Sequence, residues 1–262
     1  MRLFLNAFLL LCLLGLQACS TPGPARTVQA QQPPQSPQST LTLQSPQPRP
    51  SHEFSWNNSR WQHLTLPSKK QTLYTLGNQQ GRDAMQAQAK SSASMMRQDV
   101  RIAAKDLDVV KFSWHVPELI RDADLAERDF DDSPVRIVLV FEGDKSKFSA
   151  KNAMLSEMAE ILSGEPLPYA TLMYVWCNKR EPGSVVVNPR TDRIRSIVVE
   201  SGARNLRQWL DYERHIRADY KKAFGEAPGD LLRVGIMTDS DNTQSQTVAS
   251  YGSMYFGKTL SK

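Results

Sequence analysis

The chain has 262 residues, of which 40% are hydrophobic and 23% charged, and its formal net charge is +5. Arg2, Arg26 and Arg49 lie in the first fifty residues, where no acid occurs, so the remainder has 29 basic and 27 acidic residues and a net charge of +2. Because basic and acidic residues alternate in this nearly neutral part, the pI of 9.1 does not indicate a nucleic-acid-binding protein.

Residues 1–18 are predicted to be an export signal. Arg2 precedes an apolar run over residues 3–16 that is too short to be a good transmembrane span. The tetrapeptide Leu-Gln-Ala-Cys that ends at Cys19 resembles the bacterial lipobox, which implies a diacylglyceryl thioether on Cys19 and membrane attachment of a lipoprotein. An ordinary cleaved signal is the alternative. In the resembled class, Ser20 after the cysteine favours the outer membrane, with the protein facing the periplasm.

Residues 19–51 are expected to be the lipidated cysteine and a disordered tether. The stretch from residue 20 to 51 is rich in Pro, Gln and Ser and has no acidic residue, aromatic residue or lysine. It offers too little apolar surface to offset chain entropy, and its prolines favour an extended, polyproline II backbone. Residues 52–262 then form one domain, in which Cys177 is the remaining cysteine, expected as a small buried hydrophobe.

Several runs in this domain alternate with period two, as half-buried strands do. In residues 109–116 one face is apolar and the other carries Lys111, Ser113 and His115; residues 135–143 alternate in the same way. Further strands are predicted at residues 71–76, 83–97, 169–178, 193–201, 207–216, 231–239 and 248–256. So many strands with turn-rich connections predict a mainly β fold, an antiparallel β-sandwich or jelly roll.

Two helices are predicted among the strands. The first opens with Ser149 as a cap, closes on Gly164 and has one apolar stripe. The stripe is expected to fill the core and consists of Met154, Met158, Ile161 and Leu162. A shorter helix is predicted to end at Gly225.

In chain order, "DDSPVRIVLVF", "YVWCN", "NPRTDRIRSIVVESG", "RQWLDYERHIRADYKKAFGEAP", "VGIMTDSDNT" and "SYGSMYF" resemble the bacterial family called domain of unknown function 3047. The resemblance runs from roughly Trp61 to Phe256, with Cys177 where a small residue such as Ser is usual. It implies an exported protein with a β-sandwich similar to galactose-binding and carbohydrate-binding modules. It supplies no catalytic residue and no cofactor.

Strand parity suggests where a ligand could bind. Tyr174, Trp176 and Asn178 share one face of a strand whose other face is equally apolar, so that strand is covered twice, by core and helix or by core and a ligand groove. In residues 207–216 one face is distinctly polar. A sheet face could therefore gather a set of charged side chains, namely Arg136, Arg195, Glu213, Asp239 and Asp241. Either these form a structural network around core aromatics, or they fix the hydroxyls of a sugar on which the rings stack.

The segment "DSDNT" at residues 239–243 groups acids between two strands. Gln244 and Ser250 stand where an EF-hand needs Gly and Glu, which excludes that motif. Asp239 and Asp241, with the Asn242 carbonyl, stay weak candidates for a looser cation site. We expect instead that they close the turn and that Asp239 or Asp241 reaches a sheet arginine. The preceding acids Asp131 and Asp132 are also expected to have structural roles, such as pairing with Arg136.

The sequence thus predicts an exported, lipid-anchored β-sandwich that binds a glycan or another envelope polymer, without a cofactor and with no chemistry that the residues point to. No Ser, His and acid stand in a recognisable nucleophile motif, and a thiolate pair of Cys177 with His215 would need the fold to bring the two together. The alternatives are an envelope hydrolase that uses carboxylates such as Glu213 and Asp241, and a purely structural envelope component. Carboxylates that converge across open space would favour the hydrolase, and carboxylates tied to arginines would favour binding or structure.

Overall fold

The computed structural model describes residues 52–57 and 60–258. The predicted signal, Cys19 and the predicted tether lie outside the described residues. Among the described residues, no helix is long and apolar enough to cross a membrane.

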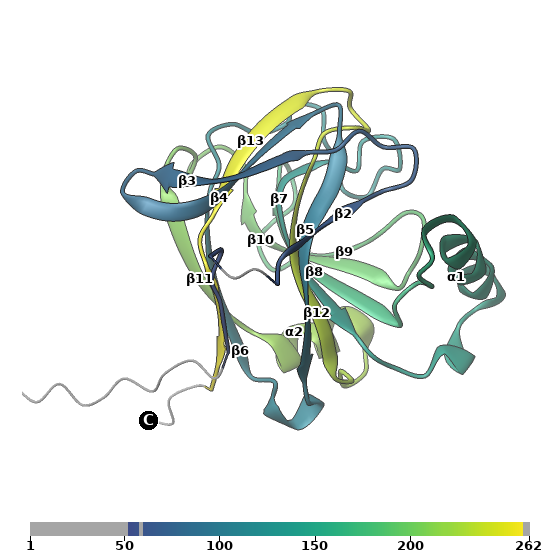
Figure 1. The fold of residues 1–262 in the computed structure, drawn as a ribbon. Helices are drawn as coiled ribbons and strands as arrows, with labels where there is room; N and C mark the ends of the chain where they lie inside the picture. The colour runs from purple at the N-terminus through teal and green to yellow at the C-terminus, as the bar shows by residue number, and fades with distance from the viewer. Residues whose placement is uncertain (1–51, 58–59, 259–262) are drawn as a thin grey trace, which may run out of the picture. The chain divides into compact units, whose positions relative to one another are not determined.

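Two seven-stranded sheets make up the domain (Figure 1). The first, which we call sheet A, consists of β1 (His52–Phe54), β14 (Met254–Gly257), β6 (Val109–His115), β13 (Gln246–Tyr251), β4 (Arg82–Lys90), β3 (Leu73–Gln79) and, on the other side of β6, β11 (Trp209–His215). The second, sheet B, has the order β2 (Gln62–Thr65), β5 (Ala93–Ile102), β12 (Leu231–Asp239), β7 (Ser133–Phe141), β8 (Ala170–Cys177), β10 (Ile194–Ser201) and β9 (Val185–Val187).

The main core lies between the two sheets. Phe112 of sheet A stacks on Tyr174 of sheet B with ring centroids 5.5 Å apart, and Trp114 lies 6.4 Å from Trp176. These four rings are almost fully buried. The predicted inward face of β6 is confirmed, whereas β7, predicted to be half-buried, is buried on both faces. The fold is the expected β-sandwich.

A second apolar cluster covers the opposite face of sheet B. Val138, Met173, Val175 and Cys177 lie in it, together with Leu125 from the long connection before β7. The prediction that β8 is covered on both faces is confirmed, and Cys177 is buried there as expected. Tyr174 and Trp176 face the core between the sheets.

The strand pattern departs from the prediction in three ways. Residues 83–97 form two strands, because the chain turns at Ser91, where φ is 45°, and residues 248–256 divide likewise between β13 and β14. The short strands β1, β2 and β9 were not predicted. Pairing is antiparallel throughout the described sheets except between β8 and β10, which run parallel.

Both predicted helices are present: α1 (Ala150–Ser163) and α2 (Ile216–Phe224), with short 3₁₀ turns at Ala104–Asp106 and Lys145–Lys147. Ser149 caps α1 by accepting a hydrogen bond from the Asn152 amide, and Gly164 and Gly225 end the two helices at φ 77°. The expectation that the apolar stripe of α1 fills the core is wrong. Its four large side chains are exposed, with Ile161 at 83%.

Candidate functional site

The outer face of sheet A, which points away from the core, is the polar face of the sandwich. Since Phe112 and Trp114 point inward, Lys111, Ser113 and His115 of β6 point outward, and on the edge strand β11 so do Trp209, Asp211 and Glu213. The distinctly polar face predicted for residues 207–216 is thus the outer face of this sheet.

The β3–β4 hairpin curls toward this outer face. Its tip lies against β11, because the indole of Trp209 donates to the Gln79 carbonyl at 2.9 Å (Figure 1). The guanidinium of Arg82 lies 5.3 Å from the Trp209 ring and donates to both carboxylate oxygens of Asp211, at 2.8 and 3.1 Å. The hairpin and the opposite edge of the sheet are therefore joined across the face.

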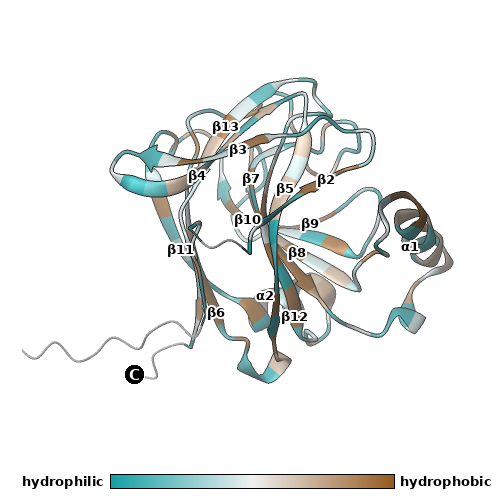
Figure 2. Cartoon of the chain, viewed as in Figure 1, coloured by the Kyte–Doolittle hydropathy of each residue, from teal (hydrophilic) through white to brown (hydrophobic). Residues whose placement is uncertain are grey.

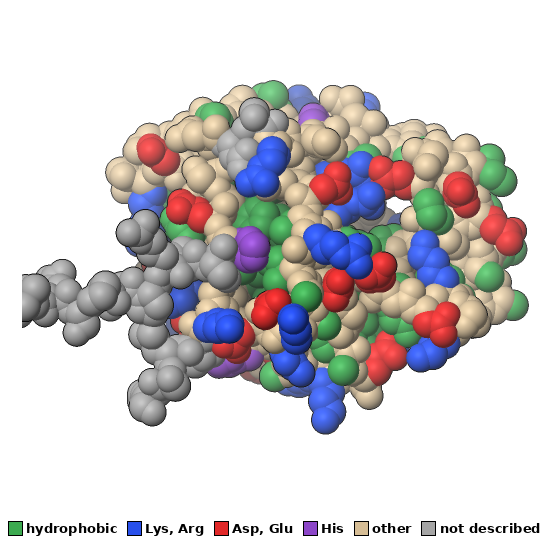
Figure 3. All heavy atoms as spheres, turned by 60° about the horizontal axis from the view of Figure 1, so that its bottom comes forward, with side chains coloured by type: hydrophobic (Ala, Val, Ile, Leu, Met, Phe, Trp, Pro, Cys, Tyr) green, Lys and Arg blue, Asp and Glu red, His purple; other side chains and the backbone are tan. Residues whose placement is uncertain are grey.

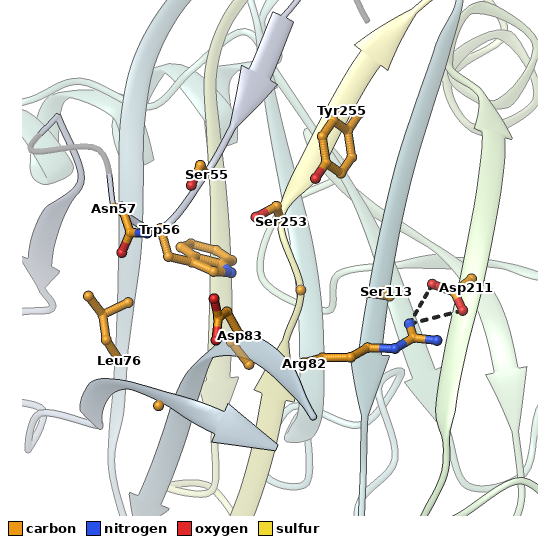
Figure 4. Close-up of a pocket in the computed structure, with 13 residues that line it drawn as sticks. Ser55, Trp56, Asn57, Leu76, Arg82, Asp83, Ser113, Asp211, Ser253 and Tyr255 are labelled. Carbon is orange, nitrogen blue, oxygen red and sulfur yellow. Dashed lines mark hydrogen bonds and ion pairs between the residues drawn. The ribbon is translucent and has the colours of Figure 1, made fainter. Parts of the chain in front are cut away.

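A depression of about 690 Å³, larger than the two others described below, lies where the start of β4 meets β6, β11 and the corner between β13 and β14. Its wall combines aromatic rings, hydroxyls, an amide and ion-paired groups (Figure 4). Labelled there are Ser55, Trp56, Asn57, Leu76, Arg82, Asp83, Ser113, Asp211, Ser253 and Tyr255. Burial raises the pKa of Tyr255, so its hydroxyl stays protonated near neutral pH and can both donate and accept a hydrogen bond.

Two smaller depressions share this outer face. One, of about 300 Å³, is lined by Gln86, Gln88, His115 and Ser250, with the exposed side chains of Leu73 and Val248 beside them. His115 is 5% exposed, and its Nε2 atom has no hydrogen-bond partner among the described residues. The other, of about 370 Å³, lies around Lys111, Glu213 and Tyr255. Because the depression of about 690 Å³ shares Ser113, Asp211 and Tyr255 with it, a ligand could extend across both.

Two ion pairs lie on this face, while Asp83 accepts a hydrogen bond from the Asn78 amide. Besides the pair of Arg82 and Asp211, Lys111 lies 2.8 Å from Glu213. Basic and acidic side chains are also interspersed over the face of the molecule shown in Figure 3. The arrangement offers hydrogen-bonding groups and apolar contacts with little net charge.

Most of the predicted ligand-binding residues lie elsewhere. Tyr174 and Trp176, at 0% and 1% exposure, are core residues and cannot stack on a ligand, which corrects the prediction of a groove at these rings. Asn178 donates to the Ile120 carbonyl and holds a loop. Arg195 lies on β10, where it donates to the Ala223 carbonyl of α2. Of the predicted set, only Glu213 lines the depressions on sheet A.

Arg136 and Asp239 form a buried ion pair in sheet B. Arg136 donates to both oxygens of Asp239 at 2.9 Å and to Asp131 at 3.1 Å. The expected pairing of these acids with a sheet arginine is confirmed. Burial raises the pKa of Asp239 to about 7, although Arg136 acts in the opposite direction. The expectation that Arg195 and Glu213 share this face is wrong, because Glu213 belongs to the other sheet.

The DSDNT segment continues this network. One carboxylate oxygen each of Asp132, Asp239 and Asp241 lie within 4.8 Å of one another, a spacing that could hold a cation. However, Asp241 already pairs with Lys69, and Asp239 with Arg136. Asp132 accepts from the backbone amides of Asn242 and Thr243, so an acid from the segment before β7 holds the turn that the segment's own acids were expected to close. Lysine and arginine thus supply the positive charge that a metal would bring.

An apolar groove of about 330 Å³ crosses the outer face of sheet B beside α1. Val138, Val140 and Met173 form its floor. Two of its charged groups pair with each other, since Arg97 donates to both oxygens of Glu165 at 2.8 and 2.5 Å, while the Nε atom of Arg97 has no partner among the described residues. This groove suits a polar ligand less well than the depressions on sheet A.

Comparison with known proteins gives a family but no activity. The model of a family described as "Protein of unknown function (DUF3047)" matches residues 59–255. A search of curated proteins finds no match.

Solved structures with a similar arrangement are distant. They include the family 11 carbohydrate-binding module of the cellulosomal cellulase Lic26A-Cel5E of Clostridium thermocellum, at TM-score 0.40 and 6% identity over 80% of this chain and 97% of that one. TmCBM61 in complex with β-1,4-galactotriose follows at TM-score 0.35 and 12% identity, over 80% and 100%. The xyloglucanase domain of NopAA from Sinorhizobium fredii has TM-score 0.36 and 7% identity, over 77% and 99%. At these scores the likenesses carry no argument about this chain's ligand.

Proposed function

This chain belongs to the family of unknown function DUF3047, and we propose from its own geometry that its domain binds carbohydrate on the outer face of sheet A. One observation carries the proposal: three neighbouring depressions on that face combine amides, hydroxyls and aromatic rings with exposed aliphatic side chains. A sugar presents the matching chemistry, because its C–H faces pack on apolar groups while its hydroxyls donate and accept hydrogen bonds.

The pairing of charges favours a neutral glycan. Arg82 and Lys111 are each bound to a carboxylate, so neither is free to recognise a phosphate or a uronate. Gln86 and Gln88 instead offer amides that both donate and accept. The Nε2 atom of His115, buried without a partner among the described residues, is a further group that a ligand hydroxyl or a water could satisfy.

The same pairing favours binding over hydrolysis. Both oxygens of Asp211 are engaged by Arg82, and Glu213 is engaged by Lys111. Glu213 of β11 and Asp241 of the turn after β12, named for the hydrolase alternative, pair with different lysines, Lys111 and Lys69. In the described part of the chain, Asp211 and Glu213 are therefore not free to act as acid and base in the way glycoside hydrolysis needs.

A glycan array tests the proposal. The wild-type protein is expected to bind a set of neutral oligosaccharides, and Tyr255→Ala to lower the affinity about tenfold, since a stacked aromatic ring contributes roughly 1 kcal/mol beyond its buried area. Val187→Ala is the matched control, because Val187 is an exposed strand residue of sheet B. Binding by wild type, Tyr255→Ala and Val187→Ala with equal affinity would contradict the site, and no binding to any glycan would contradict the function.

We further propose that the protein is a lipoprotein anchored through Cys19, in the outer membrane and facing the periplasm. The lipobox-like sequence that ends at Cys19 supports this. Cys19→Ala should abolish labelling of the protein by a fatty-acid analogue fed to the cells. Equal labelling of variant and wild type would exclude the anchor.

A further inference from the structure

The apolar groove on the outer face of sheet B has an aliphatic lining. Its volume of about 330 Å³ falls in the range of small-molecule sites, roughly 300–1,000 Å³. Val138, Val140 and Met173 form the floor, and Leu64 and Met95 continue it toward the edge strand β2. Among the described residues that line the groove, none is aromatic. In Figure 2, α1 lies beside this part of sheet B and is brown, and therefore hydrophobic, over much of its length.

This lining is unsuited to a peptide or a sugar. Strands β5, β12, β7 and β8 beneath the groove each pair with a neighbour on both sides, so none has a free edge to which an extended peptide could add. Pro166 and Pro168, which also line the groove, have no backbone N–H to donate. A peptide or a sugar would therefore bury polar groups against aliphatic side chains without partners, which is unfavourable. An alkyl chain carries no such groups.

The charged residues that line the groove form one cluster. Arg97 and Arg233 both pair with Glu165, at 2.5 and 3.0 Å. The lining thus contains two arginines and one acid, and the shielded Nε atom of Arg97 has no acceptor among the described residues. The excess of cationic donors at this cluster is complementary to an anionic headgroup.

A neighbouring depression of about 510 Å³ adds a further cation. It meets the groove at Arg233, which lines both. Of the acids that line only this depression, Asp99 pairs with Arg233. The other, Glu142, pairs with Arg101. Lys145 is exposed there and takes part in no ion pair among the described residues, so the polar side of the groove favours a negative charge.

We propose that this groove binds a long-chain fatty acid. The alkyl tail lies over Val138, Val140 and Met173, and the carboxylate lies at the cluster of Arg97 and Arg233. The site is on the opposite sheet from the proposed carbohydrate site and does not depend on it. A fatty acid meets both requirements of the groove, since its tail needs no hydrogen bonds and its head is an anion.

Calorimetry with saturated fatty acids of 8, 10 and 12 carbons tests the tail. The full chain carries Cys19→Ala, so that no acyl chain on Cys19 competes for the groove. The dissociation constant should fall about fourfold for each added CH₂ group that the groove buries. Decanoate should also bind several-fold more tightly than decanol, which has the same tail without the charge. An affinity that does not depend on chain length would overturn the proposal, and equal binding of acid and alcohol would contradict the place of the head.

A substitution that fills the groove tests its position. Val140 is half-buried in the floor, and Val140→Trp should weaken dodecanoate binding at least about tenfold, because the ring displaces two or more CH₂ groups of the tail. Val187→Trp, at an exposed position outside the groove, is the matched control. If Val140→Trp lowers the melting temperature, Leu162→Glu replaces it, since Leu162 lines the groove, is 65% exposed and would place a carboxylate beside the tail. Unchanged binding in the folded groove variant would exclude this site.

Native mass spectrometry of the wild-type full chain, as isolated from cells, distinguishes the occupants. A non-covalent adduct with the mass of a fatty acid, reduced in Val140→Trp or Leu162→Glu but not in Val187→Trp, supports the proposal. A peptide or a phospholipid in its place, lost with the same substitutions, would contradict it.

Discussion

Asp239 is a buried carboxylate with structural partners, although the acids around it resemble a binding site. It is 4% exposed, accepts from the Ser133 amide at 3.0 Å and pairs with Arg136. Burial with Asp131 and Asp132 nearby raises its pKa to about 7, from an ordinary value of 3.8. Burial thus favours the protonated carboxyl, and the pairing with Arg136 favours the ionised one.

The sign of the pH effect follows from that shift. Because the folded pKa lies above the unfolded one, the contribution of Asp239 to stability is fully present below about pH 3.8 and is lost as the pH rises through about 7. Asn cannot ionise, so the cost of Asp239→Asn should shrink by about 2–4 kcal/mol between pH 4 and pH 8. Urea unfolding of both proteins across this range measures it. A cost that grows with pH would show that Arg136 dominates and that the ionised form is the favoured one.

The acidic turn should be insensitive to calcium. Asp241 is neutralised by Lys69 and Asp239 by Arg136, so a cation would have to displace both. Calcium also takes six to eight oxygens, more than three carboxylates with other partners readily supply. Millimolar calcium should leave the melting temperature unchanged. A calcium-dependent rise that Asp241→Asn abolishes would make the turn a metal site.

For a single residue, the sequence predicts the charged partner of a side chain better than the position of that side chain in the fold. The pairing of Asp239 with a sheet arginine can be predicted because Asp239 ends a predicted strand, where a carboxylate can pair with a charge on a neighbouring strand. The position of Glu213 cannot, because parity tells which residues share a face of one strand, and only long-range pairing decides which sheet that strand joins.

Among the elements, α2 is joined to strands of both sheets by one buried carboxylate, in addition to its apolar packing. Asp219 accepts from Arg214 of β11 at 2.9 and 2.6 Å and from the Tyr174 hydroxyl of β8 at 3.0 Å. Burial, followed by the Asp219 charge, raises the pKa of Tyr174 well above its usual value, so this hydroxyl stays a donor. The carboxylate thus links one helix to strands of both sheets.

Removal of that carboxylate should be costly. Asp219→Ala leaves Arg214 and Tyr174 without an acceptor and should lower the free energy of unfolding by about 3 kcal/mol, as breaking a buried pair does. Glu213→Ala is the matched control on the neighbouring strand position, because its pair with Lys111 is exposed and contributes at most about 1 kcal/mol. Urea unfolding compares the two, and equal costs would show that Asp219 does not anchor α2.

Helix prediction succeeded for the ends of α1 and failed for its orientation. Ser149 and Gly164 act through local hydrogen bonds and backbone conformation, which the sequence carries. The apolar stripe in the sequence indicates that α1 has a contact face, but it does not indicate whether that face contacts the domain. Since Asn152 and Ser156 face the domain, the stripe points outward, and this could be seen only once Asp192 and Thr191 were placed.

On the scale of the whole molecule, strand number and parity predict the sandwich, but not its topology or its site. The candidate site joins strands β3, β4, β6, β11, β13 and β14, which are up to about 180 residues apart in the chain. The alternation in residues 83–90 already marks Gln86 and Gln88 as one face, and that of residues 207–216 marks Asp211 and Glu213. No local signal indicates that a hairpin brings these two faces together.

Hydrogen–deuterium exchange with the glycan that binds most strongly on the array tests the central claim most directly. If carbohydrate binds the outer face of sheet A, its addition should slow amide exchange in residues 73–79, 82–90 and 209–215 and leave the segments beside the apolar groove, residues 64–67 and 159–168, unchanged. Protection confined to the groove segments, with none in the three strands of sheet A, would contradict the account.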